Sequence, residues 1–227
     1  EACAAAGTHY ADLTGETQFM RRAIDAADAR ARETGARIVH TCGFDSIPSD
    51  IGVLLLHEHA KATGAGELGK TDLVVTAMRG GFSGGTLDSA RTGVDQAKAD
   101  KALRRLMADP YALSPNRGAD PDGRDERDPM GPLRDPELGG WYAPFVMGPV
   151  NTRVVRRSNA LLGHAYGKGF RYRELLATGR APKGPILATA VSGGIAALFA
   201  GLAIPPTRKL LDRVLPDPGE GPSEEKR

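Results

Sequence analysis

The hydrophobic pattern of the first 65 residues switches between the two-residue period of strands and the longer period of helices. Thr8–Leu13 and Arg37–Thr41 are short runs with the composition and alternation of half-buried strands. The segment between them has Phe19, Ile24 and several alanines on one helical side and ends at Gly35. A strand, a helix and a strand in this order predict a βαβ unit with parallel strands. The expected elements are a helix over 1–6, strand Thr8–Leu13, a helix capped by Thr14 or Thr17 that runs to about Thr34, and strand Arg37–Thr41.

The segment after the second expected strand, Cys42–Gly52, is a candidate ligand loop. It leads into an apolar helix expected at Val53–Thr63, with Ser46 as its candidate N-cap and Pro48 in its first turn. In open α/β sheets, ligands bind at the carboxyl ends of the strands. The position of this loop in the βαβ order therefore predicts that it lies beside a ligand.

The middle of the chain is less regular. Residues 108–140 contain six prolines, five glycines and six aspartates, and they have few apolar side chains to bury. We therefore expect a flexible insertion there. The other expected elements are strand Thr71–Met78, one long helix Leu87–Met107, an apolar stretch over 141–150, a short helix Val154–Leu162 and strand Gly169–Leu176.

Four glycines lie within six residues in the segment Gly80–Thr86, between an expected strand and an expected helix. Glycine lets a backbone approach a ligand closely, and the following helix N-terminus offers free N–H groups. The segment has neither the Lys-Ser/Thr end of a P-loop nor the position of a dinucleotide fingerprint. It predicts a site for an anionic group or a thioester oxygen, with a tight turn into the helix as the alternative.

Pro185–Ile204 is a run of 20 residues without a charged side chain. This length suits a membrane span, but its glycines and hydroxyl residues reduce the gain from inserting it into lipid. Three alternatives stay open: a spanning helix, a helix on a membrane surface, and a buried helix.

Composition excludes several classes of protein. The 227 residues carry 30 basic and 28 acidic side chains, and no basic patch is interleaved with aromatic residues, so no nucleic acid is expected as a partner. The two cysteines, Cys3 and Cys42, exclude a disulfide scaffold, and no Cys/His cluster has zinc spacing, so no metal is expected. A chain of this length buries enough surface to fold without such staples. The two ends, a helix-forming start without Met and a Pro/Gly-rich linker over 216–227, lead us to expect a fragment of a longer polypeptide.

Three motifs, Gly7–Glu16, His40–Asp50 and Gly80–Thr86, resemble in order and spacing those of the saccharopine dehydrogenase-like oxidoreductases. The sequence is most similar to their actinobacterial branch, the trans-acting enoyl reductases of polyketide-type lipid synthesis, and the resemblance covers essentially the whole chain. It implies an α/β fold. Residues 1–65 would be the C-terminal part of a Rossmann-like parallel sheet, and 70–215 a second α/β (α+β) substrate-side domain with a flexible insertion at 108–140, an apolar helix at 185–204 and a tail at 216–227.

The resemblance also implies chemistry, that of an NAD(P)H-dependent oxidoreductase acting in trans on acyl-lipid or polyketide intermediates. The cofactor, NADP or NAD, would be bound mainly by an N-terminal glycine fingerprint that these residues lack, so the chain alone is expected to be inactive. The expected partners are the acyl substrate, on a carrier protein or free, a membrane surface and a second copy in a homodimer. The expected location is the cytoplasm, at the periphery of the plasma membrane.

The candidate site residues come from the three motifs. His9 or Tyr10, which end the first expected strand together with Asp12, could donate a proton to a carbanion after hydride transfer. Helix capping, packing and dipole contacts are the structural alternatives for the same side chains. Arg153, Arg156 and Arg157 are candidates to contact a carrier protein or its phosphopantetheine, with a solvated helix face as the alternative. The candidates are Tyr10, Asp12, Asp45 and Ser46 for catalysis, Cys42, Gly43, Phe44 and Asp50 for the cofactor, and Gly80, Gly81, Ser83, Gly84, Gly85 and Thr86 for the substrate.

Two other functions stay open at this point. One is an amino-acid dehydrogenase of the saccharopine type, although a small charged substrate gives the apolar segment no role. The other is a non-catalytic protein that binds membranes or lipids. A substrate screen separates the first from an enoyl reductase, and vesicle flotation together with a redox assay separates the second.

Overall fold

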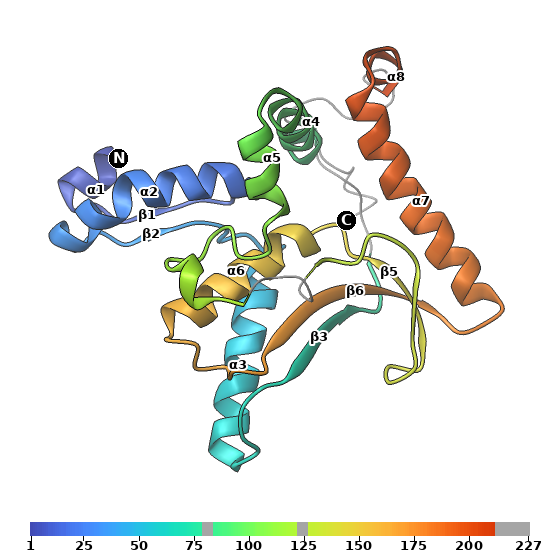
Figure 1. Cartoon of the computed structure of the whole chain (residues 1–227), viewed down its shortest axis with the longest axis horizontal. Helices are drawn as coiled ribbons and strands as arrows, with labels where there is room; N and C mark the ends of the chain where they lie inside the picture. Colours follow the sequence, from blue (N-terminus) through green and yellow to red (C-terminus); the bar gives the residue numbers. More distant parts are fainter. Residues whose placement is uncertain (79–83, 122–126, 212–227) are drawn as a thin grey trace, which may run out of the picture. The chain divides into compact units, whose positions relative to one another are not determined.

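A computed structural model of the chain describes residues 1–78, 84–121 and 127–211. It forms two compact units, each built from three stretches of sequence (Figure 1). The predicted boundary near residue 70 lies close to the first change of unit, after Leu73, but two later stretches return to the first unit. The first unit comprises Glu1–Leu73, Leu106–Asp128 and Met147–Arg173, and the second comprises Val74–Arg105, Pro129–Val146 and Glu174–Arg227.

The first unit begins with the predicted βαβ unit. Its elements are α1 (Ala2–Ala6), β1 (Tyr10–Ala11), α2 (Thr17–Thr34) and β2 (Ile38–Val39). The strands pair in parallel, with Tyr10 opposite Ile38 and Ala11 opposite Val39, so the predicted topology is confirmed, although both strands are shorter than expected. The predicted cap of α2 is wrong. Glu16 is the N-cap residue and makes no side-chain cap, while the Thr14 hydroxyl accepts the Glu16 N–H at 3.2 Å in the preceding turn.

The main core of this unit forms where α3 (Ile47–Thr63) packs against α6 (Gly148–Leu161). Val53 of α3 and Val155 of α6 are buried together with an aromatic group. Within that group the ring of Tyr166 lies 5.1 Å from that of Phe170, in an edge-to-face arrangement. A smaller cluster of alanines, Ala4, Ala27 and Ala31, joins α1 to α2, because small side chains let the two helices approach closely.

The structure of helix α6 contradicts both expectations for its arginines, a contact with a carrier protein and a solvated helix face. Arg153 and Arg156 are 5% and 4% exposed, so they form neither a solvated face nor a surface for a carrier protein. Arg153 pairs with Asp128 at 2.8 Å, and Arg156 donates to the Tyr172 carbonyl at 2.9 Å. Arg157 donates to the Leu113 carbonyl at 2.7 Å. The three guanidinium groups therefore serve to hold chain segments inside the unit.

A second sheet has the strand order β3-β6-β5-β4. The β4–β5 and β5–β6 pairs are antiparallel, and the second carries a register irregularity at Trp141 and Tyr142. The strands are β3 (Lys70–Val75), β4 (Leu133–Asp135), β5 (Gly140–Pro144) and β6 (Arg171–Gly179). The chain as a whole is thus mixed α/β, as predicted.

The prediction of a single long helix over Leu87–Met107 is wrong in one respect, the continuity of the helix. It is two helices, α4 (Gly84–Ala99) and α5 (Lys101–Ala108). Asp100 separates them, and its carboxylate accepts the backbone N–H groups of Ala102 at 2.7 Å and Leu103 at 3.2 Å. This is the geometry of an N-cap, which begins a new helix.

The stretch over 108–140 is also more ordered than its composition predicts. Tyr111 and Leu113 are buried, η1 (Arg117–Ala119) follows them, and β4 lies near the end of the stretch. Asp135 is 4% exposed and accepts the N–H groups of Glu137 and Leu138, which fixes the β4–β5 turn. The expectation of a structureless insertion is therefore wrong for these segments, while 122–126 lie outside the described residues. The apolar run forms α7 (Lys183–Ala203), and α8 (Pro205–Leu211) follows it.

Candidate functional site

Asp12 stands at the carboxyl end of β1 and joins it to the end of β2. Its carboxylate lies 2.6 Å from His40 Nδ1 and accepts the backbone N–H groups of Thr14 at 3.1 Å and Thr41 at 3.3 Å. Its own carbonyl accepts the Cys42 N–H at 2.8 Å. One aspartate therefore ties the end of β1 to the start of the predicted ligand loop.

Asp12 is the charged centre of this cluster. Burial raises the pKa of its carboxyl, but the hydrogen bonds from His40 and from the Thr14 N–H outweigh burial, and the net pKa lies below the usual value. An ionised carboxylate only accepts hydrogen bonds, so His40 Nδ1 is the donor in their contact. Tyr10 also hydrogen-bonds to Asp12, and that bond raises the pKa of the Tyr10 phenol.

His40 is a functional candidate that the sequence reasoning missed. Its side chain is 11% exposed, and its ring meets the edges of Tyr10 and Phe19 at centroid distances of 6.1 and 5.7 Å. The strand register contains a signal for it. Asp12 follows Ala11 as His40 follows Val39, and those two residues pair in parallel. A parallel alignment of the two strand motifs therefore sets the carboxylate beside the imidazole.

The residue after His40 has an unusual backbone. Thr41 has φ = 57°, in the left-handed region that β-branched residues avoid, and it is 5% exposed. The Thr41 N–H donates to Asp12, and its hydroxyl donates to the His40 carbonyl at 2.6 Å. Such strain persists only where surrounding contacts enforce it, and it gathers at functional sites.

The loop from Cys42 to Asp50 is anchored by Asn151 of α6, which is fully buried. The Asn151 amide donates to the Asp45 carbonyl at 2.8 Å and to Ser49 Oγ at 3.2 Å, and its oxygen accepts the Ser46 hydroxyl at 2.8 Å. Ser46 occupies the N-cap position of α3, but its side chain makes no capping bond, so that part of the prediction is wrong. Asn151 lies 105 residues from Ser46 in sequence, and no local pattern identifies it.

The other loop residues differ widely in exposure. Phe44 is 92% exposed and Asp45 is exposed, whereas Ser46 is 2% exposed and Gly43 is buried. The Cys42 thiol donates to the Val39 carbonyl at 3.7 Å. The catalytic roles expected for Asp45 and Ser46, and the cofactor roles expected for Cys42, Gly43 and Phe44, stay predictions.

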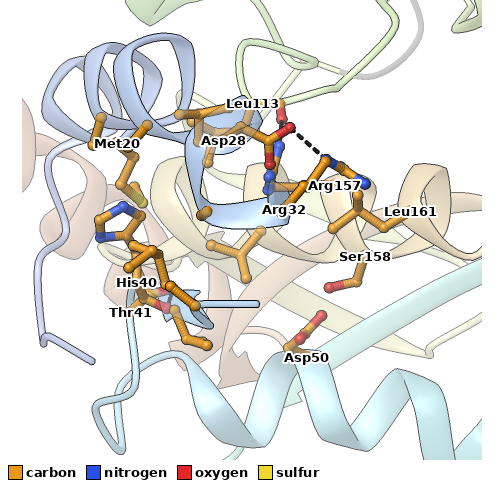
Figure 2. A pocket seen from close by; sticks show the side chains of 18 of the residues that line it. Met20, Asp28, Arg32, His40, Thr41, Asp50, Leu113, Arg157, Ser158 and Leu161 are labelled. Atoms are coloured by element: carbon orange, nitrogen blue, oxygen red, sulfur yellow. Dashed lines mark hydrogen bonds and ion pairs between the residues drawn. The ribbon is translucent and has the colours of Figure 1, made fainter. Parts of the chain in front are cut away.

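A cavity of about 440 Å³ opens within the first unit, with walls from α2, the end of β2, α3 and α6. Figure 2 shows Asp50 of α3 in this cavity near Ser158 of α6, with His40 and Thr41 on the wall at β2. Burial raises the pKa of Asp50, and a hydrogen bond with Ser158 opposes this effect. Asp50 Oδ1 is buried without a hydrogen-bond partner among the described residues.

A second cavity, of about 410 Å³, shares Ala23, Ala27, Ile38 and His40 with the first. Tyr10, Phe19 and His40 contribute their rings to its wall, and most of its lining is apolar. His40 therefore borders both cavities, and the hydrogen bond from its Nδ1 to Asp12 fixes the orientation of its ring. This arrangement can hold a flat apolar group beside an imidazole that is fixed in one orientation.

The glycine-rich motif is described only in part. Gly80, Gly81 and Ser83 lie outside the described residues. Gly84 opens α4 in the second unit, and Gly85 and Thr86 are exposed in its first turn. Within 1–78, 84–121 and 127–211, no group of three or more His, Cys, Asp or Glu side chains is placed to hold a metal ion.

Comparison with known proteins gives a consistent set of relatives. The chain is 50% identical over 239 residues to a Mycobacterium tuberculosis H37Rv protein with the provisional name of trans-acting enoyl reductase, a match that covers 98% of the chain and 55% of the relative. It is 47% identical to the trans-acting enoyl reductase of Mycobacterium bovis BCG, covering 98% of the chain and 55% of the relative. It is 46% identical to that of Mycobacterium ulcerans, covering 100% of the chain and 56% of the relative.

The chain therefore spans about half the length of the curated relatives it matches. No family model matches it. No solved structure matches it either.

Proposed function

We propose that the polypeptide containing this chain is an NAD(P)H-dependent enoyl reductase of the saccharopine dehydrogenase-like type, which acts in trans on the acyl intermediates of a polyketide or lipid synthase. Relatives at 46–50% identity over nearly the whole chain carry the name trans-acting enoyl reductase. The structural observation that carries the proposal is the Asp12–His40 pair at the carboxyl ends of two parallel strands. This is the edge at which α/β sheets bind cofactors and substrates.

The cavity beside His40 fits the nicotinamide end of such a cofactor. Its walls are mostly apolar and include the rings of Tyr10 and Phe19, against which a flat ring can pack. Because most of this lining is apolar, we assign the nicotinamide to this edge. When bound, it supplies the hydride that adds to the β-carbon of the enoyl group.

His40 is the proton donor in this proposal. Addition of hydride at the β-carbon moves the electrons of the double bond toward the carbonyl, and the α-carbon then takes a proton. His40 Nδ1–H donates a hydrogen bond to Asp12, so Nε2 is the ring nitrogen from which a proton can move to the substrate. Tyr10 packs against the imidazole and hydrogen-bonds to the same carboxylate, so it is a positioning residue.

The test is the rate of NADPH oxidation with an α,β-unsaturated acyl thioester, using the polypeptide as its gene encodes it. We expect His40→Gln to lower kcat by about 10²- to 10⁴-fold, the usual contribution of general acid catalysis, and to change the Kd of NADPH much less than it changes kcat. His59→Gln is the matched control, because His59 is exposed on α3. Activity with a secondary amine in place of the enoyl thioester, or full activity of His40→Gln, would overturn the proposal.

A further inference from the structure

Helix α7 is attached to the second unit along one side. It packs on β5 and on α4, and its buried residues are Gly184, Ala188, Ser192 and Leu202. The approach is close at Gly184, where a Cβ atom would lie 2.5 Å from the Gly179 carbonyl oxygen and 3.2 Å from the Trp141 Cβ. Figure 1 shows α7 as a long straight helix beside β5. Its place on the sheet is therefore well fixed.

The side of α7 opposite Gly184, Ala188 and Ser192 is exposed and carries Ile186, which is 71% exposed, and Leu187 next to it is 50% exposed. Phe199 is 42% exposed but lies seven residues from Ser192, at the edge of the packed side, and Ile204 just after the helix is 50% exposed. The helix is long and apolar enough to cross a membrane, with a mean hydropathy of 2.0 over an 18-residue window of which 17% is buried. A core helix of this hydropathy would be mostly buried. An exposed helix side of this hydropathy, without a charged side chain, indicates an interaction site.

Basic side chains stand at both ends of this surface. Arg180 and Lys183 are exposed at the N-terminal end. At the other end Lys98 of α4 donates to the Ala203 carbonyl, and Arg208 of α8 pairs with Asp95 at 2.7 Å. Four cations and one carboxylate thus flank an uncharged face. This combination complements an anionic lipid surface, where apolar side chains enter the acyl boundary and cations meet the headgroups.

We propose that α7 docks the protein on anionic membranes, with the helix in the plane of the bilayer surface and its Ile186 side toward the lipid. A spanning orientation would take β5, which α7 covers, into the hydrocarbon, where an open sheet cannot satisfy its backbone groups. The surface lies within the second unit, so this inference does not depend on the proposed reductase activity.

Vesicle flotation of the gene-encoded polypeptide tests this docking. The probes are vesicles of phosphatidylcholine alone and of phosphatidylcholine with about 30% phosphatidylglycerol. We expect the protein to float with the anionic vesicles and less with the neutral ones. Ile186→Glu should reduce the bound fraction about tenfold or more, because a carboxylate resists entry into the acyl region. Leu55→Glu is the matched control, since Leu55 is 64% exposed on α3 in the first unit.

A charge-reversal variant separates the two parts of the docking surface. Lys183→Glu should remove the preference for anionic vesicles and retain weak binding to neutral ones. Circular dichroism and the oligomeric state by sedimentation are measured for every variant, so that misfolding is recognised. Absence of flotation for the wild type, or equal flotation of Ile186→Glu and Leu55→Glu, would overturn the proposal. Self-association that Ile186→Glu abolishes, without flotation, would show that a second copy covers α7 and would overturn it as well.

Discussion

The loop after β2 and helix α7 are fixed in opposite ways. Asn151 holds the loop by three hydrogen bonds, two of them buried, that join segments over 100 residues apart in sequence. Helix α7 is held by close apolar packing, and the hydroxyls of Thr189 and Ser192 bond to carbonyls of their own helix, each at 2.8 Å. Directional bonds fix the orientation of groups, which proton transfer requires. Apolar packing fixes the position of α7 on the sheet, and the side of α7 that faces away from β5 stays available for a surface contact.

Removal of the polar anchor, Asn151, should have the largest effect on stability among the variants that test this comparison. Asn151→Ala would remove the partner of the buried Ser46 and Ser49 hydroxyls, and each buried polar group left unpaired costs about 1–3 kcal/mol. We expect the free energy of unfolding to fall by about 2–4 kcal/mol, measured by urea denaturation. Asn116→Ala, at an exposed position, should change it by less than about 0.5 kcal/mol. Equal effects of the two variants would show that the loop does not depend on its polar anchor.

Two glycines of α7 test the packed side against the exposed side. An added Cβ at Gly184 would collide with the backbone of Gly179, so Gly184→Ala should destabilise the protein by about 1–3 kcal/mol. At Gly193 nothing lies within 4 Å of an added Cβ. Gly193→Ala should therefore stabilise by about 0.5–1 kcal/mol through its helix propensity. Thermal unfolding measures both changes, and the same sign for both would contradict one-sided packing of α7.

The two regions also differ in how far the sequence predicts them. The uncharged run at 185–204 predicts a helix directly, because its hydropathy is a local property. The motifs at Asp12 and His40 predict strand ends and a ligand loop, but their contact requires the pairing register of β1 and β2. No local pattern identifies Asn151 as the loop anchor, because its partners are distant in sequence.

The same reason accounts for the corrections. The charged pattern of α6 predicts a solvated or partner-facing side, yet Arg153 and Arg156 are buried against carbonyls and a carboxylate from other segments. The composition of 108–140 predicts disorder, yet Tyr111 and Leu113 are buried. The burial of these side chains depends on contacts with residues that are far away in the sequence. Local sequence patterns do not reveal such contacts. The substrate roles expected for the glycine-rich motif stay predictions.

The smallest effect concerns Asp50, the buried carboxyl of the cavity beside the loop. Its pKa is raised in the folded state, mainly by burial, so the folded protein binds more protons than the unfolded chain between the ordinary pKa and the raised one. Stability contributed by this group is therefore lost as the pH rises through that window. Asp50→Asn, of similar size, should raise the melting temperature at pH 7, and the difference from wild type should shrink as the pH falls toward the ordinary pKa of aspartate. The measurement is thermal unfolding of both proteins from pH 7 down to pH 4, with Asp45→Asn as the control at an exposed position. A difference that grows toward low pH would mean that Asp50 is stabilised as the anion, and that the cavity holds a cationic partner for it.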